Sequence, residues 1–328
     1  MREAGRQTQP NKYELNTKAR STNLRLTRLL YDLSYMSEKV KRRLKIMKHA
    51  IMVIGHGDDA SILQATITHL DAPNIDFYIH WDKRFEQPTL TATQSDIRFI
   101  PQQKVRWGTE DLVFVPRALM NAAMNQGQYD YFHLISAVDM PLFSVEYFDE
   151  FFNGLDYLGF VGEISQDVQR RLSWFWPVKY FNLQSQVGMK VLKIIKVVNL
   201  ILHIDRVKGK FPVKKGSNWY SLTRETTKKL IQFPNYRFFK HSYIGDEMFA
   251  QTILADEQIR IQSNMTTDVL IDDNFQAARY IDWHRGTPYQ FTIEDAAELA
   301  GVYNTKFAFA RKIKDVATVN AVFEKVKK

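Results

Sequence analysis

The feature that most constrains the fold is an alternation of short apolar runs and amphipathic stretches between residues 50 and 136. Four runs have the length and the β-branched and aromatic content of buried strands: 50–54, 76–80, 97–100 and 131–136. Helical spacing of apolar residues predicts helices over 60–70 and 111–124. Because strands joined by helical crossovers form parallel sheets, we expect an α/β fold with a mostly parallel sheet and helices on both faces.

The carboxyl ends of three predicted strands carry polar residues. His56 follows the first strand between two glycines, Asp82 follows the second strand, and Asp139 follows the fourth. Ligands bind at this edge of open parallel sheets. A glycine-flanked strand end alone is usually only a turn, so the pattern indicates where a site would lie and not what it binds.

Beyond residue 160 the alternation is weaker. Further elements are predicted as helices over 187–202, 224–233 and 247–254, a strand over 217–222, and a capped helix from Thr292 to Leu299. No linker or repeat interrupts residues 47–328, which we expect to form a single domain. The helix over 187–202 carries Lys190, Lys193 and Lys196, which fit either a solvated face or contact with an anionic membrane or polymer.

The positive charge of the chain is concentrated at its N-terminus. The formal net charge is +9, but residues 1–48 hold 13 Lys and Arg against 4 Asp and Glu, and the other 280 residues hold 32 of each. Residues 1–46 are expected to be a basic, partly disordered arm that is either a flexible extension, a segment upstream of a natural start at Met47, or a membrane-surface helix. Nucleic-acid binding is not expected, because the arm has no aromatic platform and the domain is charge-balanced.

Several classes of protein are excluded by what the sequence lacks. The chain has no Cys, and hence no disulfide, thiolate metal site or Cys nucleophile. It also has no run of about 18 apolar residues and no signal-peptide pattern, so neither a transmembrane helix nor a secretory leader is expected. The G-x-x-x-x-G-K-[ST], G-x-G-x-x-G, H-E-x-x-H and G-x-S-x-G signatures are absent. The D-x-D triplet, which holds a divalent cation on many nucleotide-sugar donors, is absent too, so positive side chains would have to replace the metal.

A series of motifs makes the prediction more specific. In chain order they are Val105 to Gly108, His133 to Leu142, Gly216 to Arg224, Tyr243 to Leu254, Asp282 to Gly286 with Pro288, and Phe307 to Lys312. In this order and spacing, residues 48–314 resemble the Core-2/I-branching β-1,6-N-acetylglucosaminyltransferase family, which includes the peptide O-xylosyltransferases. The resemblance implies a GT-A-like fold and an inverting, metal-independent glycosyltransferase with a UDP-sugar donor, so we expect no metal and no other cofactor.

The resemblance also implies roles for the charged residues of two motifs. Glu247 matches the family's catalytic glutamate, which would take the proton of the acceptor hydroxyl. Arg311 and Lys312 match the basic residues that contact the donor diphosphate and would neutralise the charge on the leaving UDP. An alternative for Glu247 is a purely electrostatic role at a helix start. Gly245 stands where the family usually has Pro.

Other candidate residues would surround the donor and the acceptor. The resemblance assigns His56 and Asp82 to uracil or ribose, and Asp139 to ribose or the sugar, with turn capping as the alternative for Asp139. Candidates for the sugar and acceptor subsites are Trp107, Glu163 and Trp219, with core packing as the alternative for the tryptophans. Thr109 replaces the second glycine of the family's W-G-G segment.

The expected function is transfer of a sugar, with GlcNAc as the first candidate, from a UDP-sugar to a hydroxyl of a surface glycan or lipid-linked saccharide. Animal members are rich in Cys and carry a Golgi anchor; because the chain has neither, we expect a bacterial, cytoplasmic enzyme of exopolysaccharide biosynthesis, peripheral on the inner face of the membrane. The alternatives are a catalytically inactive glycan-binding or scaffold protein of the same fold and a nucleic-acid-binding protein.

Overall fold

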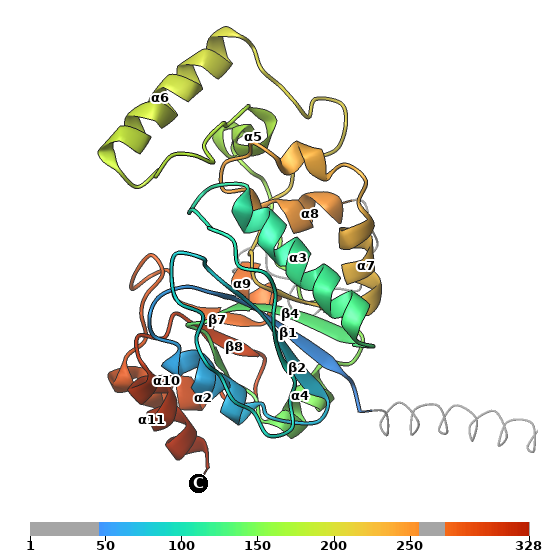
Figure 1. The fold of residues 1–328 in the computed structure, drawn as a ribbon, viewed down its shortest axis with the longest axis vertical. Helices are drawn as coiled ribbons and strands as arrows, with labels where there is room; N and C mark the ends of the chain where they lie inside the picture. The colour runs from blue at the N-terminus through green and yellow to red at the C-terminus, as the bar shows by residue number, and fades with distance from the viewer. Residues whose placement is uncertain (1–45, 256–272, 328) are drawn as a thin grey trace, which may run out of the picture. The chain divides into compact units, whose positions relative to one another are not determined.

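The computed structural model of the chain describes residues 46–255 and 273–327, and residues 47–328 make up one compact unit (Figure 1). The arm proposed for residues 1–46 lies outside the described residues, except for Ile46. Its predicted disorder and helix therefore remain predictions.

A five-stranded sheet forms the centre of the unit, with the strand order β3-β2-β1-β4-β6. Its strands are β1 (His49–Gly55), β2 (Ile75–Trp81), β3 (Ile97–Phe99), β4 (Tyr131–Ser136) and β6 (Tyr220–Thr223). The first four pair in parallel, as the strand–helix alternation predicts, and β6 pairs antiparallel with β4. The fold is thus the α/β, GT-A-like arrangement expected from the sequence.

Both faces of the sheet are buried because β1 places apolar residues on each side. Ala50 and Met52 belong to one hydrophobic core, whereas Ile51 and Val53 belong to another, as the two-residue period of a strand requires. Helices α3 (Asp111–Gln126) and α7 (Arg224–Gln232) contribute to the first core, and α2 (Ser61–His69) and α4 (Val145–Phe151) to the second (Figure 1).

A smaller sheet lies beside the main one. It has the order β5-β8-β7, with β5 (Met140–Pro141), β7 (Arg279–Ile281) and β8 (Phe309–Arg311). The C-terminal helices α10 (Ala296–Gly301) and α11 (Val316–Val326) pack in its core, and the capping box predicted at Thr292 opens the 3-10 turn Ile293–Asp295 just before α10. This sheet carries Arg311 to the end of β4, because β8 pairs with β5 directly after the β4 turn.

The remaining helices lie beyond the sheet. They are α5 (Gln166–Ser173), α6 (Gln186–Ile201), α8 (Phe249–Ile253) and α9 (Asp273–Gln276), with 3-10 turns at Tyr236–Phe239 and Gly245–Glu247. The predicted helix over 247–254 is therefore split, because Glu247 ends a 3-10 turn and α8 begins at Phe249. In Figure 1, α6 lies at one end of the unit, farther from the sheet than α5.

The loop after β1 depends on Gly55. A Cβ atom there would lie 2.1 Å from a ring carbon of Trp81, so only glycine lets this ring pack against the strand end. Trp81 Nε1 also donates to the carbonyl of Gly57 at 3.2 Å. The ring thereby fixes the turn that presents His56 at the carboxyl edge of the sheet.

Candidate active site

Four of the sequence-predicted residues come together at the carboxyl edge of the sheet: His56, Asp82, Arg311 and Lys312. His56 is exposed after β1, and its pKa is lowered by desolvation and by the positive charges of Lys312, Arg84 and Arg311, while Asp82 opposes this shift. The ends of β1 and β2 are adjacent, because the Asp82 amide donates to the Gly55 carbonyl at 2.9 Å, and the charge of Lys312, which follows β8, acts on His56.

Asp82 is buried and already has several partners. Arg84 donates to it from Nη2 at 2.6 Å and from Nε at 3.1 Å, and the amides of Arg84 and Val105 donate at 3.0 and 3.2 Å. Burial alone would raise the pKa of Asp82, but these hydrogen bonds lower it below its ordinary value. Asp82 therefore holds the loop after β2 against residue 105, and Arg84 contacts both of its carboxylate oxygens.

The buried Asp139 forms an ion pair with the partly buried Arg311. Arg311 Nη1 lies 2.7 Å from Asp139 Oδ1, and the same nitrogen donates to Ser136 Oγ. Asp139 also accepts from the amide and hydroxyl of Ser136 at 2.7 and 2.6 Å, so it closes the turn after β4 as well as holding Arg311. The guanidinium carbon lies 4.2 Å from the ring centroid of Trp219, which is only 8% exposed. Trp219 thus supports Arg311 with its ring face.

Lys312 differs from its neighbour. It is partly buried, and desolvation and the Arg311 charge lower its pKa, whereas Asp139 opposes the shift. Among the described residues its amine makes no ion pair, so this cation remains available to a ligand.

Glu247 is held through one of its two carboxylate oxygens. Arg171 Nη1 lies 3.1 Å from Oε2 and Lys215 Nζ lies 3.4 Å from it, and the side chain is 34% exposed. The amide of Gly216 donates to the Glu247 carbonyl at 2.9 Å, which fixes the backbone. Within the described part of the chain, no hydrogen bond reaches Oε1. The carboxylate is therefore oriented by two cations with one oxygen left for another partner.

Asp246, the preceding residue, is in a different environment. Asn218 Nδ2 donates to its Oδ2 at 3.2 Å, and its Oδ1 is enclosed with no hydrogen-bond partner in the described residues. Burial and the adjacent Glu247 carboxylate raise the pKa of Asp246 to about 7. Because Asn218 precedes Trp219 in the chain, the segment 216–219 connects the Asp246-Glu247 turn to the cations on β8.

The turn that carries these acids has a strained entry. Ile244 has a φ of 51°, an unfavourable region for a β-branched residue, and its amide donates to the Gly108 carbonyl at 3.0 Å. At Gly245 a Cβ would lie 2.4 Å from Ser242 Oγ, so the glycine found where the family usually has Pro allows close packing.

Two further candidates are exposed. Trp107 is 51% exposed, and its ring meets that of Tyr243, four residues before Glu247, edge-on at 6.3 Å between centroids. Trp107 thus presents an exposed aromatic ring in contact with Tyr243. Glu163 is exposed two residues after Val161, whose amide bonds to the Lys215 carbonyl at 2.8 Å, and the described residues give its carboxylate no partner.

The sequence does not single out three residues of the site as functional: Arg84, Arg171 and Lys215. Arg84 stands two residues after Asp82, a spacing that suits a side-chain pair next to a strand end. Arg171 and Lys215 lie beyond residue 160, where the alternation of strands and helices is weak. They precede Glu247 by 76 and 32 residues in the chain, so only the tertiary structure brings them to it.

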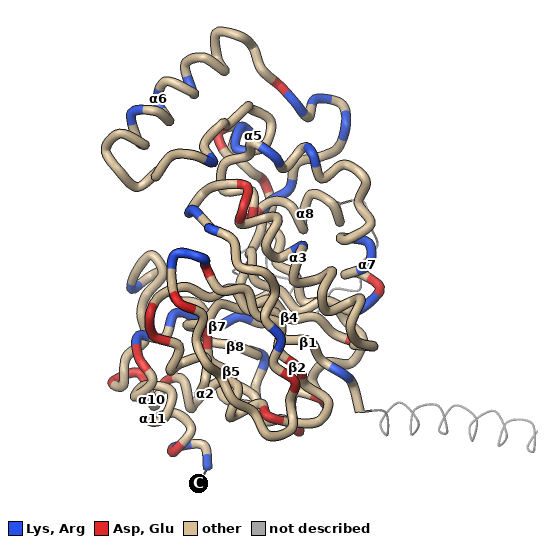
Figure 2. Tube along the Cα trace, viewed as in Figure 1, with Lys and Arg blue, Asp and Glu red and all other residues tan. Residues whose placement is uncertain are grey.

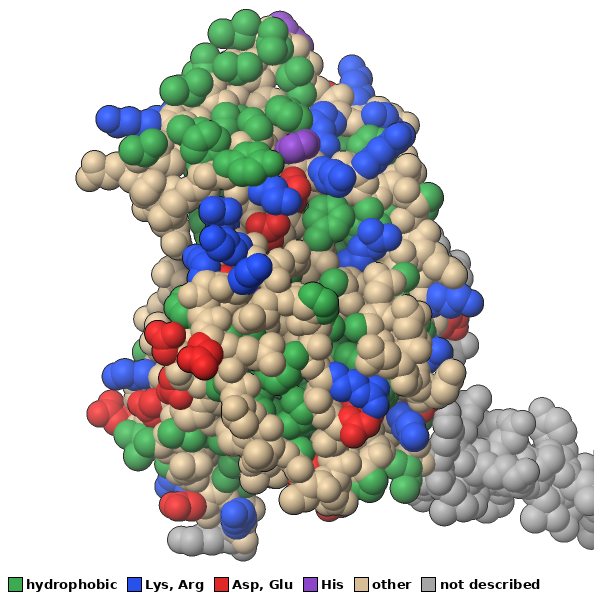
Figure 3. Space-filling view, in the orientation of Figure 1, with side chains coloured by type: hydrophobic (Ala, Val, Ile, Leu, Met, Phe, Trp, Pro, Cys, Tyr) green, Lys and Arg blue, Asp and Glu red, His purple; other side chains and the backbone are tan. Residues whose placement is uncertain are grey.

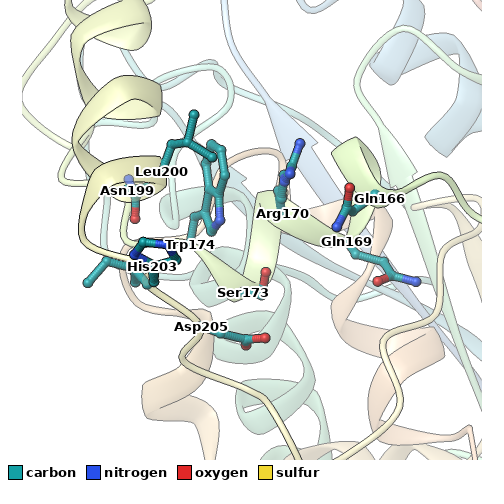
Figure 4. A pocket seen from close by; sticks show the side chains of 10 residues that line it. Gln166, Gln169, Arg170, Ser173, Trp174, Asn199, Leu200, His203 and Asp205 are labelled. Atoms are coloured by element: carbon teal, nitrogen blue, oxygen red, sulfur yellow. The ribbon is translucent and has the colours of Figure 1, made fainter.

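A separate pocket lies on the other side of α5. It has a volume of about 240 Å³, and Arg170, Trp174 and Asn199 are among its lining residues (Figure 4). Figure 4 shows Gln166, Gln169 and Ser173 along one face of α5, opposite the end of α6. Arg171 is not among the lining residues, so α5 presents one face to Glu247 and another to this pocket.

Residues 46–255 and 273–327 contain no candidate metal site and no candidate membrane span. No group of three or more His, Asp or Glu side chains there is arranged to hold a metal ion. No helix in the same ranges is long and apolar enough to cross a membrane.

The fold and the site define a class of protein. The mostly parallel GT-A-like sheet carries charged residues at its carboxyl edge, as the sheet of a glycosyltransferase would. The family model of the Core-2/I-Branching enzyme matches residues 50–300, and the chain belongs to this family of glycosyltransferases. A search of curated proteins finds no match. A sugar donor and a glycan acceptor are therefore its substrates.

Proposed function

We propose that the protein is an inverting, metal-independent glycosyltransferase that moves GlcNAc from UDP-GlcNAc to a hydroxyl of a surface glycan or lipid-linked saccharide. The observation that carries this proposal is the separation of charges in the site. One carboxylate, Glu247, is held by two cations through Oε2 and has no hydrogen bond to Oε1 in the described residues. The segment 216–219 separates it from the proposed donor cations, because Asn218 contacts Asp246 and the next residue, Trp219, contacts Arg311.

In the proposed reaction the acceptor oxygen attacks the anomeric carbon from the face opposite UDP. Its proton passes to Glu247, a new C–O bond forms, and the bond from the anomeric carbon to the phosphate oxygen breaks. Inversion follows because attack and departure occur on opposite faces. The ion pairs of Oε2 with Arg171 and Lys215 orient the carboxylate so that Oε1 can receive the proton.

The charge on the departing UDP would be met by side chains. Lys312 is the cation without an ion pair among the described residues and would contact the diphosphate directly. Arg311, already held by Asp139, would add a fixed positive charge. We propose His56 and Asp82 for the uridine, Asp139 for the sugar side of the donor, and Trp107 and Glu163 for the sugar and acceptor subsites. Trp219, which the sequence also suggested for a sugar subsite, is buried in the core beneath Arg311 and would act through that cation.

We further propose that the enzyme is cytoplasmic and works at the inner face of a membrane, in the assembly of a bacterial exopolysaccharide. The basic, apolar surface of α6 supports this location, which would bring the enzyme to lipid-linked acceptors.

Release of UDP from a panel of UDP-sugars, with and without saccharide acceptors, tests the function. We expect acceptor-dependent release with UDP-GlcNAc, reduced by at least about 100-fold in Glu247→Gln, because loss of a general base costs 10²–10⁴-fold. Equal and acceptor-independent rates for the two proteins would support the glycan-binding alternative. Release with a different UDP-sugar would change the donor and leave the mechanism in place.

A further inference from the structure

Residues 49–328 of the compact unit have no net charge, but their positive and negative charges are concentrated in different segments of the chain. Residues 168–224 hold twelve Lys and Arg and a single acidic residue, Asp205. The rest of residues 49–328 hold twenty Lys and Arg against thirty-one Asp and Glu. The basic segment contains α6, and Figure 2 shows Lys and Arg on α6 and along the chain that follows it. Electrostatic attraction to an anionic surface would therefore act mainly through this end of the unit.

Helix α6 exposes an unusual amount of aliphatic surface. Only Gly188 and Asn199 of its sixteen residues are buried. Its large apolar side chains that face solvent are Val187 (68% exposed), Met189 (51%), Ile194 (62%), Val197 (55%), Val198 (46%), Leu200 (59%) and Ile201 (67%), followed by Leu202 (62%). Figure 3 shows these hydrophobic side chains gathered over α6. An apolar surface of this kind marks an interaction site.

Four of the exposed apolar residues share one helix face. Val187, Ile194, Val198 and Ile201 follow one another at intervals of seven, four and three residues, which places them along one side of a helix. Lys190, Lys193 and Lys196 alternate with these residues in the sequence and follow a neighbouring stripe of the helix, and in the described residues none of the three makes an ion pair. Lysine stems cover apolar surface while their amines reach the polar layer above it.

The helix is firmly attached, so its exposure does not result from loose packing. Asn199 donates to the Phe175 carbonyl at 2.9 Å and accepts from the Phe175 amide at 2.8 Å. Gly188 packs so tightly that a Cβ would lie 2.0 Å from the Asn182 carbonyl oxygen. Leu192 and Ile195 pack on the small core of Trp176, Val178 and Leu183. One side of α6 is thus fixed to the protein and the other is presented to the surroundings.

We propose that this surface of α6, defined by Val187, Ile194, Val198, Ile201 and the three lysines, docks into the interface of a bilayer that contains anionic lipids. The apolar side chains would enter the boundary between headgroups and acyl chains, and the lysines would pair with lipid phosphates. A second copy of the chain is a poorer occupant, because a symmetric contact would set lysines against lysines with no acidic residue of α6 to compensate.

Helix α5 connects the proposed docking surface to the candidate active site. Arg171 of α5 contacts Glu247, and the opposite face of α5 borders the pocket at the end of α6. Docking would therefore hold the glutamate beside the membrane, where a lipid-linked acceptor is anchored. This consequence rests on the proposed function, whereas the docking itself does not.

Co-flotation of the full chain with vesicles tests the proposal. The vesicles contain phosphatidylcholine alone or with 30% phosphatidylglycerol (about one anionic lipid in three). We expect binding to the anionic vesicles, reduced at least about tenfold in Ile194→Asp/Ile201→Asp and in Lys190→Gln/Lys193→Gln/Lys196→Gln. Matched controls are Ile293→Asp, which changes a 57% exposed isoleucine elsewhere, and Lys228→Gln/Lys325→Gln/Lys327→Gln, which removes three charges outside the surface.

Several outcomes would overturn the proposal. They are no binding to either vesicle, binding that the α6 variants leave unchanged, equal losses in the controls, or a dimer in light scattering that only the α6 variants disrupt. Thermal unfolding of each variant checks its fold, and the lysine variant provides a test if Ile194→Asp/Ile201→Asp is unstable. UDP release with a soluble acceptor is measured in parallel, so that loss of docking and failure of the proposed function are distinguished.

Discussion

Arg171 Nη1 lies 3.1 Å from Oε2 of Glu247, and this contact joins α5 to the turn that carries the proposed catalytic base. Lys215 reaches the same oxygen at 3.4 Å. Both cations act on one carboxylate oxygen, which restricts rotation of the group and directs its other oxygen away from them. The pair therefore has a positioning role in addition to any contribution to stability.

Loss of this contact should slow turnover. We expect Arg171→Met to lower kcat about tenfold with a change in KM for the donor of less than about twofold, because the misplaced carboxylate acts in the chemical step. Steady-state UDP release measures both constants. Arg170→Met is the matched control, because its guanidinium lies over Trp174 at 4.8 Å and has no contact with Glu247. Equal kcat values for the two variants would refute the positioning role.

Substitution of the adjacent cations Arg311 and Lys312 should affect stability and donor binding to different extents. Arg311→Gln leaves the buried Asp139 carboxylate unpaired, and we expect the free energy of unfolding to fall by about 3 kcal/mol. Lys312→Gln removes a cation that has no ion pair in the described residues, so stability should change by less than about 1 kcal/mol while donor affinity falls. Urea unfolding and a thermal-shift titration with UDP-GlcNAc separate the effects. A large loss of stability in Lys312→Gln would contradict this division of roles.

Asp246 should make stability depend on pH. Its pKa is raised by burial and by Glu247 from 3.8 to about 7, so between these values the folded protein keeps a proton that the unfolded chain releases. The free energy of unfolding should therefore decrease as pH rises from about 4 to 7, by up to about 1.4 kcal/mol per pH unit, and be level above this window.

The variant Asp246→Asn cannot release that proton. Its free energy of unfolding, relative to the wild type, should rise steadily between pH 5 and pH 7 in urea titrations. Asp167→Asn serves as control, because the Asp167 side chain is 87% exposed. A wild-type-to-variant difference that is constant across these pH values would show that Asp246 does not titrate in the window.

Removal of divalent cations should have no effect on the reaction. We expect the thermal shift produced by UDP-GlcNAc and the rate of UDP release to be the same with and without EDTA, because Arg311 and Lys312 would supply the charge that a metal supplies elsewhere. A donor shift that EDTA abolishes and manganese restores would refute the metal-independent mechanism.

The local elements follow directly from the sequence. The predicted strand over 131–136 is β4, and helix 111–124 is α3 with two more residues, because strong apolar periodicity leaves each segment only one way to bury its side chains. The split of the helix over 247–254 was not predictable. It depends on the positive φ of Ile244 and its bond to Gly108, a residue more than a hundred positions away.

The sequence by itself determined the α/β class and the family, and it predicts the edge of the sheet at which a site would lie. The tertiary structure alone decided the partners of the charged residues. Asp82 is held by Arg84 and Asp139 by Arg311, because a buried carboxylate needs a cation or donors beside it. The partly exposed Glu247 is held by Arg171 and Lys215, which the folding of distant segments brings to it. The tertiary structure also decided that the apolar side of α6 is exposed to solvent. The periodicity of the sequence predicts an apolar helix face, but it does not show whether another element packs on that face.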